Sequence, residues 1–164
     1  MRHIGIDPGF KGGVALFEDK KCLEAFPMPL YETEKGKNTV DCKLLSRYIR
    51  ENKVELIIIE LVHTMPGQGV ASSGNFMKNF GKILGMAEGM GIKTIEVSPQ
   101  KWKKIVLRDD YAHDMKQGAI DFCTKLFPHI NLLATKRSKV PHDGIADSIC
   151  IGCSLYGLGD INII

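Results

Sequence analysis

Four acidic residues of this 164-residue chain stand at the ends of strongly apolar segments that lie far apart in the sequence: Asp7, Glu60, Asp143 and Asp147. Burying a carboxylate beside apolar residues is costly unless something compensates its charge. A divalent cation does so, and Mg²⁺ prefers carboxylate oxygen and water as ligands. If the fold brings these segments together, the residue types predict the metal site of a metal-dependent nuclease.

Two of these carboxylates, Asp7 and Asp143, also have a simpler interpretation. Asp7 opens Asp-Pro-Gly, a common turn, although a strand before it would place it at the sheet edge where open α/β sheets bind ligands. Asp143 could be a helix N-cap. Asp147 lies four residues later on the same helix face, where two like charges repel unless a cation separates them. His142 is an alternative fourth ligand, but oxygen suits Mg²⁺ better than imidazole, so we expect Asp143.

Apolar and amphipathic segments indicate the elements that must position these residues. Runs typical of strands cover residues 2–6, 12–17, 22–26, 55–60 and 94–97. Helices are expected from Asp41, over 73–90, from Pro99, over 114–127 and over 143–156. The polar, proline-containing residues 27–39 indicate a loop. Helices that separate the later strands predict an α/β fold with a mixed central sheet, and without an internal repeat or linker we expect one domain, 1–164.

Composition excludes several classes of protein. The chain is 44% hydrophobic and 25% charged, which is ordinary for a globular domain. No apolar run approaches the ~18–20 residues of a membrane span, and the N-terminus enters a strand without a signal peptide, so we expect no membrane partner and a cytoplasmic location. Five cysteines are an odd number, which argues against a full disulfide framework, and Cys150 and Cys153 suit core packing better than zinc binding or redox chemistry.

Positive charge is concentrated in two segments. Residues 98–108 carry +4 and include Lys101, Lys103 and Lys104, while residues 134–140 carry +3 and include Arg137. Because the net charge is +3, the rest of the chain is mildly acidic. Two basic segments on such a body suit a polyanion such as nucleic acid, and two solvated lysine faces are the alternative.

Three blocks in this order resemble the RuvC-like Holliday-junction resolvases of the ribonuclease H-like superfamily. They are Gly-Ile-Asp-Pro-Gly at 5–9, the strand-ending Glu60, and His-Asp-Gly-Ile-Ala-Asp-Ser at 142–148. Met-Pro-Gly-Gln-Gly-Val at 65–70 looks like the phage and chloroplast branch of that family. The resemblance runs from residue 2 to about residue 157.

The resemblance implies a mixed five-stranded sheet flanked by helices, and a homodimer that cuts four-way and other branched DNA. It implies Mg²⁺ or Mn²⁺, two ions per active site, and no small-molecule cofactor. Asp7, Glu60 and Asp147 become metal ligands, with Asp143 as the fourth. Bacterial RuvC proteins usually space the last pair by three residues, where this chain has Gly144, which cannot ligate. The loop at 65–70 favours a phage or viral protein that resolves branched DNA in its host.

Further residues take roles only from this resemblance. Lys103 and Lys116 match lysines that approach the scissile phosphate, and surface charge is their alternative. His63 stands three residues after Glu60, where bacterial enzymes place an aromatic wedge against junction bases. An imidazole can stack on a base, although His63 could also be an ordinary loop histidine.

A stripe of glycines, Gly81, Gly85 and Gly89, recurs at four-residue spacing in one expected helix. Each costs up to ~1 kcal/mol against alanine in a helix, so the stripe needs a reason. The resemblance places this helix at the dimer interface. Tight packing of the helix on its own sheet is the alternative.

Other functions share some of these features. An actin-like phosphotransferase has a similar first strand but needs two such domains, and residues 67–69 lack the Gly-Lys-Ser/Thr of a P-loop. A ribonuclease H that acts on RNA–DNA hybrid and a non-catalytic junction-binding protein both remain open. The second could lose its carboxylates, whereas this chain has all four.

Overall fold

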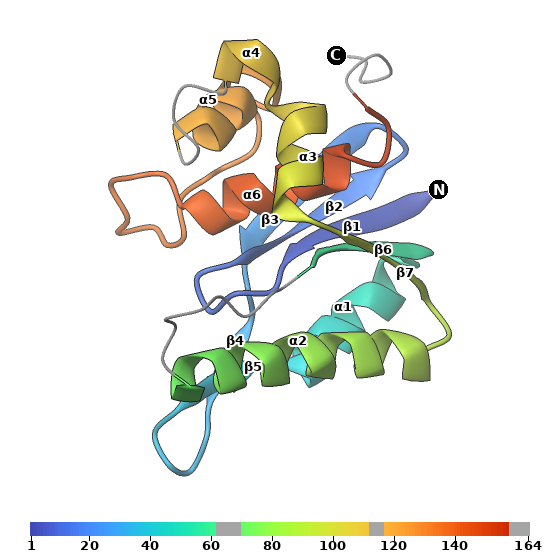
Figure 1. Ribbon diagram of the computed structural model, residues 1–164, viewed down its shortest axis with the longest axis vertical. Coiled ribbons are helices and arrows are strands. Elements are labelled where there is room, and N and C mark those ends of the chain that lie inside the picture. Colours follow the sequence, from blue (N-terminus) through green and yellow to red (C-terminus); the bar gives the residue numbers. More distant parts are fainter. Residues whose placement is uncertain (62–69, 112–116, 158–164) are drawn as a thin grey trace.

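The computed structural model describes residues 1–61, 70–111 and 117–157 and contains one large sheet (Figure 1). Its strands are β1 (Arg2–Asp7), β2 (Gly13–Glu18), β3 (Lys21–Pro27), β6 (Leu56–Glu60) and β7 (Lys93–Val97). They are ordered β3-β2-β1-β6-β7, with the β1–β2 and β2–β3 pairs antiparallel and the β1–β6 and β6–β7 pairs parallel. The expected mixed five-stranded sheet is confirmed, with β6 in the central parallel position.

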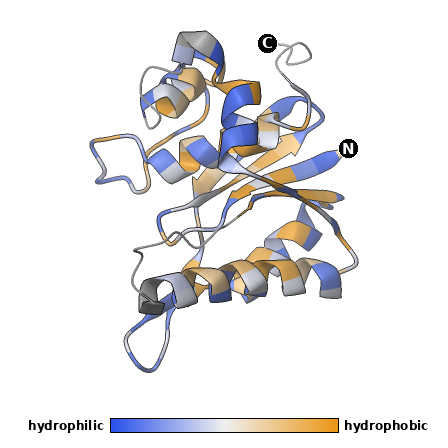
Figure 2. Cartoon of the chain, in the orientation of Figure 1, coloured by the Kyte–Doolittle hydropathy of each residue, from blue (hydrophilic) through white to orange (hydrophobic). Residues whose placement is uncertain are grey.

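Helices cover both faces of this sheet. They are α1 (Cys42–Glu51), α2 (Val70–Gly89), α3 (Pro99–Val106), α4 (Arg108–Tyr111), α5 (Gln117–Leu126) and α6 (Asp143–Cys153). Alternate side chains of β6 enter two separate cores: Ile57 and Ile59 pack with residues of α1 and α2, and Ile58 packs with residues of α3, α5 and α6. The hydrophobic strands therefore lie between two helical layers, as Figures 1 and 2 show.

Glycines allow α6 to lie directly on the sheet. A Cβ at Gly5 of β1 would collide with the carbonyl of Ser148 in α6, and a Cβ at Gly144 would collide with the carbonyl of Lys11 in the turn after β1. This close approach holds the start of α6 beside the end of β1. It is the contact that brings distant acidic residues to one place.

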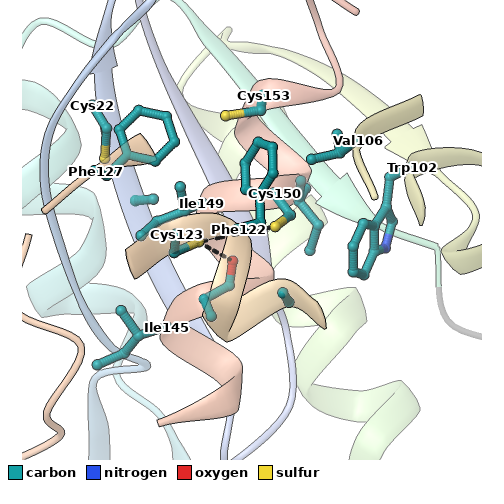
Figure 3. Close-up of a cluster of buried hydrophobic side chains, with 14 of the residues drawn as sticks. Cys22, Trp102, Val106, Phe122, Cys123, Phe127, Ile145, Ile149, Cys150 and Cys153 are labelled. Carbon is teal, nitrogen blue, oxygen red and sulfur yellow. Dashed lines mark hydrogen bonds between the residues drawn. The ribbon is translucent and has the colours of Figure 1, made fainter. Parts of the chain in front are cut away.

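The cysteines of this layer are core residues. Cys150 and Cys153 are buried free thiols, as core packing requires. Cys123 on α5 faces Cys150 with the two Sγ atoms 4.0 Å apart, and its thiol donates to the carbonyl of Ala146 at 3.5 Å (Figure 3). Burial raises the pKa of all three thiols, which keeps them protonated and poorly nucleophilic.

The expectation of a loop over residues 27–39 is wrong. This segment contains β4 (Leu30–Glu32) and the start of β5 (Asn38–Val40), which pair as an antiparallel hairpin separate from the main sheet. Gly36 supplies the left-handed turn conformation with φ of 68°. Strands of three residues are too short to show an alternating pattern.

The remaining differences concern element ends. Asp41 caps α1 as expected, its side chain accepting from the Leu44 N–H. Helix α2 begins at Val70, three residues before the expected start, and the short helix α4 is not expected at all. No helix in the ranges described is long and apolar enough to span a membrane.

Candidate active site

Asp7 and Glu60 end two neighbouring parallel strands. Ile6 of β1 pairs with Ile59 of β6, so the next residue of each strand lies at the same carboxyl edge of the sheet. Both side chains are partly buried. Because parallel strands end at one edge, the two carboxylates are forced close together by backbone register alone.

Asp7 sits in a turn that partly stabilises its charge. The Gly9 N–H donates to Asp7 Oδ1 at 3.0 Å. Burial nevertheless raises the pKa of Asp7 from its ordinary value of 3.8 to about 7, and the negative charges of Glu60 and Asp143 add to this increase. Asp7 therefore combines the expected turn with a carboxylate that lacks a sufficient counter-charge within the protein.

Glu60 has a partner that the sequence did not indicate. The indole Nε1–H of Trp102 on α3 donates to Glu60 Oε1 at 2.9 Å, and the Trp102 side chain is fully buried. Burial raises the pKa of Glu60, while the Trp102 hydrogen bond and the charge of Lys103 oppose the increase. Trp102 thus fixes one oxygen of Glu60 and leaves the other for a further ligand.

Helix α6 carries the other two carboxylates. His142, not Asp143, is its N-cap: Nδ1 of His142 accepts from the Ile145 N–H at 3.3 Å. Asp143 is therefore the first residue of the helix, and its Oδ1 accepts from the Gly144 N–H at 3.1 Å. The N-cap interpretation of Asp143 is wrong, and the ring nitrogen of His142 that caps the helix is committed to the backbone.

Asp147 lies one turn further along α6 and is partly buried. Burial raises its pKa to about 7, with Asp7, Glu60 and Asp143 adding to the increase and Lys103 opposing it. The pKa of Asp7 and the pKa of Asp147 are thus both raised by the charges of other carboxylates, although these residues come from three distant parts of the chain. Such mutual repulsion is what a bound cation would relieve.

The donor atoms of this carboxylate cluster, defined as Asp7, Glu60, Asp143 and Asp147, suit a hard cation. Carboxylate oxygens are the ligands that Mg²⁺ and Mn²⁺ prefer. As the side chains stand, no group of three or more His, Cys, Asp or Glu residues in the described ranges is arranged to hold a metal ion. By chemistry and charge, the donor atoms of the cluster nevertheless fit a divalent cation.

Lys103 is a basic residue that the fold brings to the cluster. Its charge lowers the pKa of Asp7, Glu60 and Asp147, and its Nζ lies 5.2 Å from the centre of the Trp102 ring. Lys101 and Lys104 flank it on α3 with exposed side chains. Arg137 is exposed in the loop before α6, and its charge is not among those that shift these carboxylates. His63 and Lys116 lie outside the described residues.

Trp102 is the site residue that sequence reasoning missed. It is the only tryptophan of the chain and stands in a basic helix, which is an unusual place for a large apolar side chain. Buried tryptophans usually find an acceptor for the indole N–H. That combination was the available signal, but the identity of the acceptor depends on how α3 packs against β6.

No protein-family model matches the sequence, and no curated protein matches it. Among solved structures, Thermus thermophilus RuvC superposes with a TM-score of 0.55 at 16% identity, covering 94% of this chain and 92% of that one. The same protein in complex with a Holliday junction substrate gives 0.53 at 13% identity, covering 94% and 91%.

The chain has the RuvC fold. The likeness spans nearly the full length of both chains, and it confirms the expected ribonuclease H-like α/β architecture. The yeast mitochondrial Holliday junction resolvase also matches, with a TM-score of 0.47 at 14% identity over 93% of this chain and 78% of that one. At these identities the comparison with RuvC concerns the fold, so activity has to be argued from the residues of this chain.

Proposed function

We propose that this chain is a metal-dependent endonuclease that cuts four-way and other branched DNA junctions. The observation that carries the proposal is the carboxylate cluster at the carboxyl edge of the sheet. Burial raises the pKa of Asp7 and Asp147 there, and the charges of neighbouring carboxylates on β1, β6 and α6 add to the increase. The shared fold with RuvC, solved in complex with a Holliday junction, supports branched DNA as the substrate. We propose that residues 1–164 act as a single nuclease domain.

Asp7, Glu60 and Asp147 would hold the cation, with Asp143 as the fourth ligand. Bound Mg²⁺ or Mn²⁺, two ions by analogy with two-metal nucleases, would supply an activated water and stabilise the leaving 3′-oxygen. The hydrogen bond from Trp102 presents Glu60 in one orientation. Gly9 does the same for Asp7 through its backbone N–H. These contacts position the ligands before the cation binds.

Positive residues would receive the substrate phosphates. Lys103 lies close enough to lower the pKa of three carboxylates, so its ammonium group can pair with the phosphate that enters the cluster. We propose that Lys101, Lys104 and Arg137 contact the DNA backbone further from the cut. His63 and Lys116 stay predictions from the family resemblance.

The two open alternatives differ in substrate and in chemistry. A ribonuclease H would cut RNA–DNA hybrid in preference to a junction, and a non-catalytic binding protein would bind junctions without cutting them. We expect Mg²⁺-dependent nicking of four-way junctions and little cleavage of linear duplex or hybrid. Incubation with junction, flap, duplex and hybrid substrates, with and without a chelator, distinguishes all three.

Glu60→Gln tests the cluster directly. The change keeps the shape of the side chain and removes its charge, so we expect cleavage to fall by at least about 100-fold, as when an essential metal ligand or its support is lost, with junction binding retained. Mn²⁺ titration followed by the emission of Trp102 adds a second measurement, because the indole contacts Glu60. The wild type should respond and the variant should not.

Glu96→Gln is the matched control. Glu96 is exposed on β7 and pairs with Ile59, the residue before Glu60. The substitution Glu96→Gln therefore makes the same chemical change close to the cluster without altering any of its four carboxylates. It should cut at the wild-type rate. Cleavage by Glu60→Gln at the wild-type rate in Mg²⁺ would rule out the proposed site.

A further inference from the structure

The β4–β5 hairpin lies on the same end of the sheet as the carboxylate cluster. Asp7 pairs with Gly13, and Gly13 pairs with Pro27, so β3 ends at the edge where Asp7 stands. The hairpin begins three residues later, at Leu30. In the view of Figure 1 it projects at the lower left, below the start of α6, and its tip is hydrophilic in Figure 2.

Side chains of α2 fix this hairpin in place. Asn79 is 3% exposed, and its Oδ1 accepts from Thr39 Oγ1 at 2.9 Å and from the Val40 N–H at 3.0 Å. Lys82 Nζ donates to Thr39 Oγ1 at 2.8 Å and to the Val40 carbonyl at 2.7 Å. Two buried or half-buried polar groups thus tie β5 to α2, so a ligand on the hairpin would meet a surface that is already ordered.

The same stretch of α2 lies beside the turn that follows Asp7. A Cβ built on Gly9, two residues after Asp7, would lie 3.7 Å from Cε2 of Phe76. Lys78 and Asn79, less than one turn further along the helix, line a groove between α2 and the hairpin. One rigid helix therefore joins the turn that holds Asp7 to this groove.

The groove is basic and open. Lys35 and Lys37 line it from the hairpin and Lys78 lines it from α2, against one carboxylate, Glu34. Within the ranges described, none of the three lysines forms an ion pair. Tyr31, with 48% of its surface exposed, forms part of the wall. Three lysines against one carboxylate leave an excess of positive charge in the groove, which favours a polyanionic partner.

We propose that the groove between the β4–β5 hairpin and α2 binds the phosphate backbone of a DNA arm that leaves the cleavage site. Lysine ammonium groups and the hydroxyl and amide groups beside them suit phosphate oxygens and carry no code for base identity. The groove is open, which fits a continuous duplex better than an enclosed small anion. The inference rests on the proposed function and adds a second point at which the substrate is held.

The test removes the charge of the groove. The groove variant is K35Q/K37Q/K78Q, and the control variant is K21Q/K53Q/K93Q. The three control lysines are exposed near the opposite edge of the sheet, where Lys21 pairs with Glu18 and Lys93 pairs with Leu56. Binding of long-armed and short-armed four-way junctions is measured by fluorescence anisotropy in chelator over a salt series. Circular dichroism and thermal unfolding confirm that both variants fold.

We expect the groove variant to bind the long-armed junction about tenfold more weakly than the wild type. The slope of log affinity against log salt concentration should also become shallower by about two to three units, since each lost phosphate contact removes about 0.9 from that slope. Long and short arms should then bind it almost equally, while the control variant keeps the wild-type preference. If the wild type binds and cuts junctions but the groove variant has unchanged affinity and salt slope, the inference is overturned and the proposed function stands. A wild type that binds no junction overturns both.

Discussion

Asp7 and Asp147 share an unusual property for aspartates, a pKa raised to about 7 in the folded protein. Burial beside apolar strands is the main cause, and the other carboxylates of the cluster add to it. Ionising these two aspartates therefore lowers the stability of the folded protein. An aspartate whose charge destabilises the fold is better explained by ligand binding than by a structural role.

This property predicts that the metal-free protein gains stability when the charge is removed. Between pH 3.8 and about 7 the folded state binds more protons at Asp7 than the unfolded state does, so this residue makes stability fall as pH rises. Asp7→Asn should therefore stabilise the protein at pH 8 in chelator by on the order of 2–4 kcal/mol, since one pKa unit corresponds to about 1.4 kcal/mol. The gain should shrink as the pH falls toward 4. Urea unfolding at several pH values measures it.

His3 changes stability in the opposite direction, so the comparison has to be made between variants. Burial lowers the pKa of His3 from 6.5 to about 4, and below 6.5 the unfolded state binds the extra proton, so its contribution rises with pH. This contribution is common to the wild type and the variant and cancels in their difference. Glu96→Gln, an exposed change, should show no such gain. An Asp7→Asn protein less stable than the wild type at pH 8 would contradict the charge argument.

Two adjacent residues should differ in role: His142 should be structural, and Asp143 should be needed for cleavage. His142→Ala removes the cap of α6 and should cost about 1 kcal/mol of stability with cleavage retained. Asp143→Asn should instead lose most cleavage in Mg²⁺ with little change in stability. His142→Asn, which can still cap, should recover stability. Cleavage assays and urea unfolding on the three variants decide the assignment, which reverses if folded His142→Ala is inactive and Asp143→Asn cuts normally.

At the scale of elements, α3 has one buried face, which carries Trp102, and one exposed face, which carries lysines. Trp102 is buried against the sheet and reaches Glu60, whereas Lys101 and Lys104 are exposed. Lys103 lies between these faces and acts on the cluster. Charge density alone groups the three lysines together, but the helix divides them into one residue at the site and two on its outer surface.

This division predicts different losses for the lysines. Lys103→Gln should reduce the cleavage rate more than junction affinity, because its charge acts at the cluster. Lys101→Gln with Lys104→Gln should mainly weaken binding and flatten its salt dependence by about one unit per lost phosphate contact. Single-turnover cleavage and anisotropy over a salt series separate the two effects. An unchanged salt slope for the double variant would mean that the outer surface of α3 does not face DNA.

Sequence patterns predicted long elements well and short ones poorly. The five strands of the main sheet and the position of Asp7 and Glu60 at their ends follow from apolar runs with a clear length and boundary. The β4–β5 hairpin was missed because its strands have three residues each, and its stability comes from Asn79 and Lys82, about forty residues away. Tertiary contacts of that kind leave no local pattern.

At the scale of the whole molecule, the structure decides against one of the two explanations for the glycine stripe of α2, its packing on the protein's own sheet. A Cβ at Gly81, Gly85 or Gly89 would meet no described atom within 4 Å, so packing on the protein's own sheet does not require glycine there. That alternative is wrong. Glycines that lower helix stability and are not needed for packing within the chain suit contact with a second chain. A four-way junction also presents two equivalent strands, and two copies of the protein would supply one site for each.

We therefore expect a homodimer in which α2 meets its counterpart along this stripe. Gly85→Ala should stabilise the isolated helix by about 1 kcal/mol, because alanine is the better helix former and has room here, and yet weaken self-association. Gly85→Leu should yield a folded monomer. Lys125→Leu, an exposed change on α5 across the sheet, should remain dimeric. Light scattering at micromolar concentration, alone and with junction DNA, measures the oligomeric state, and a wild type that stays monomeric on the junction would refute the dimer.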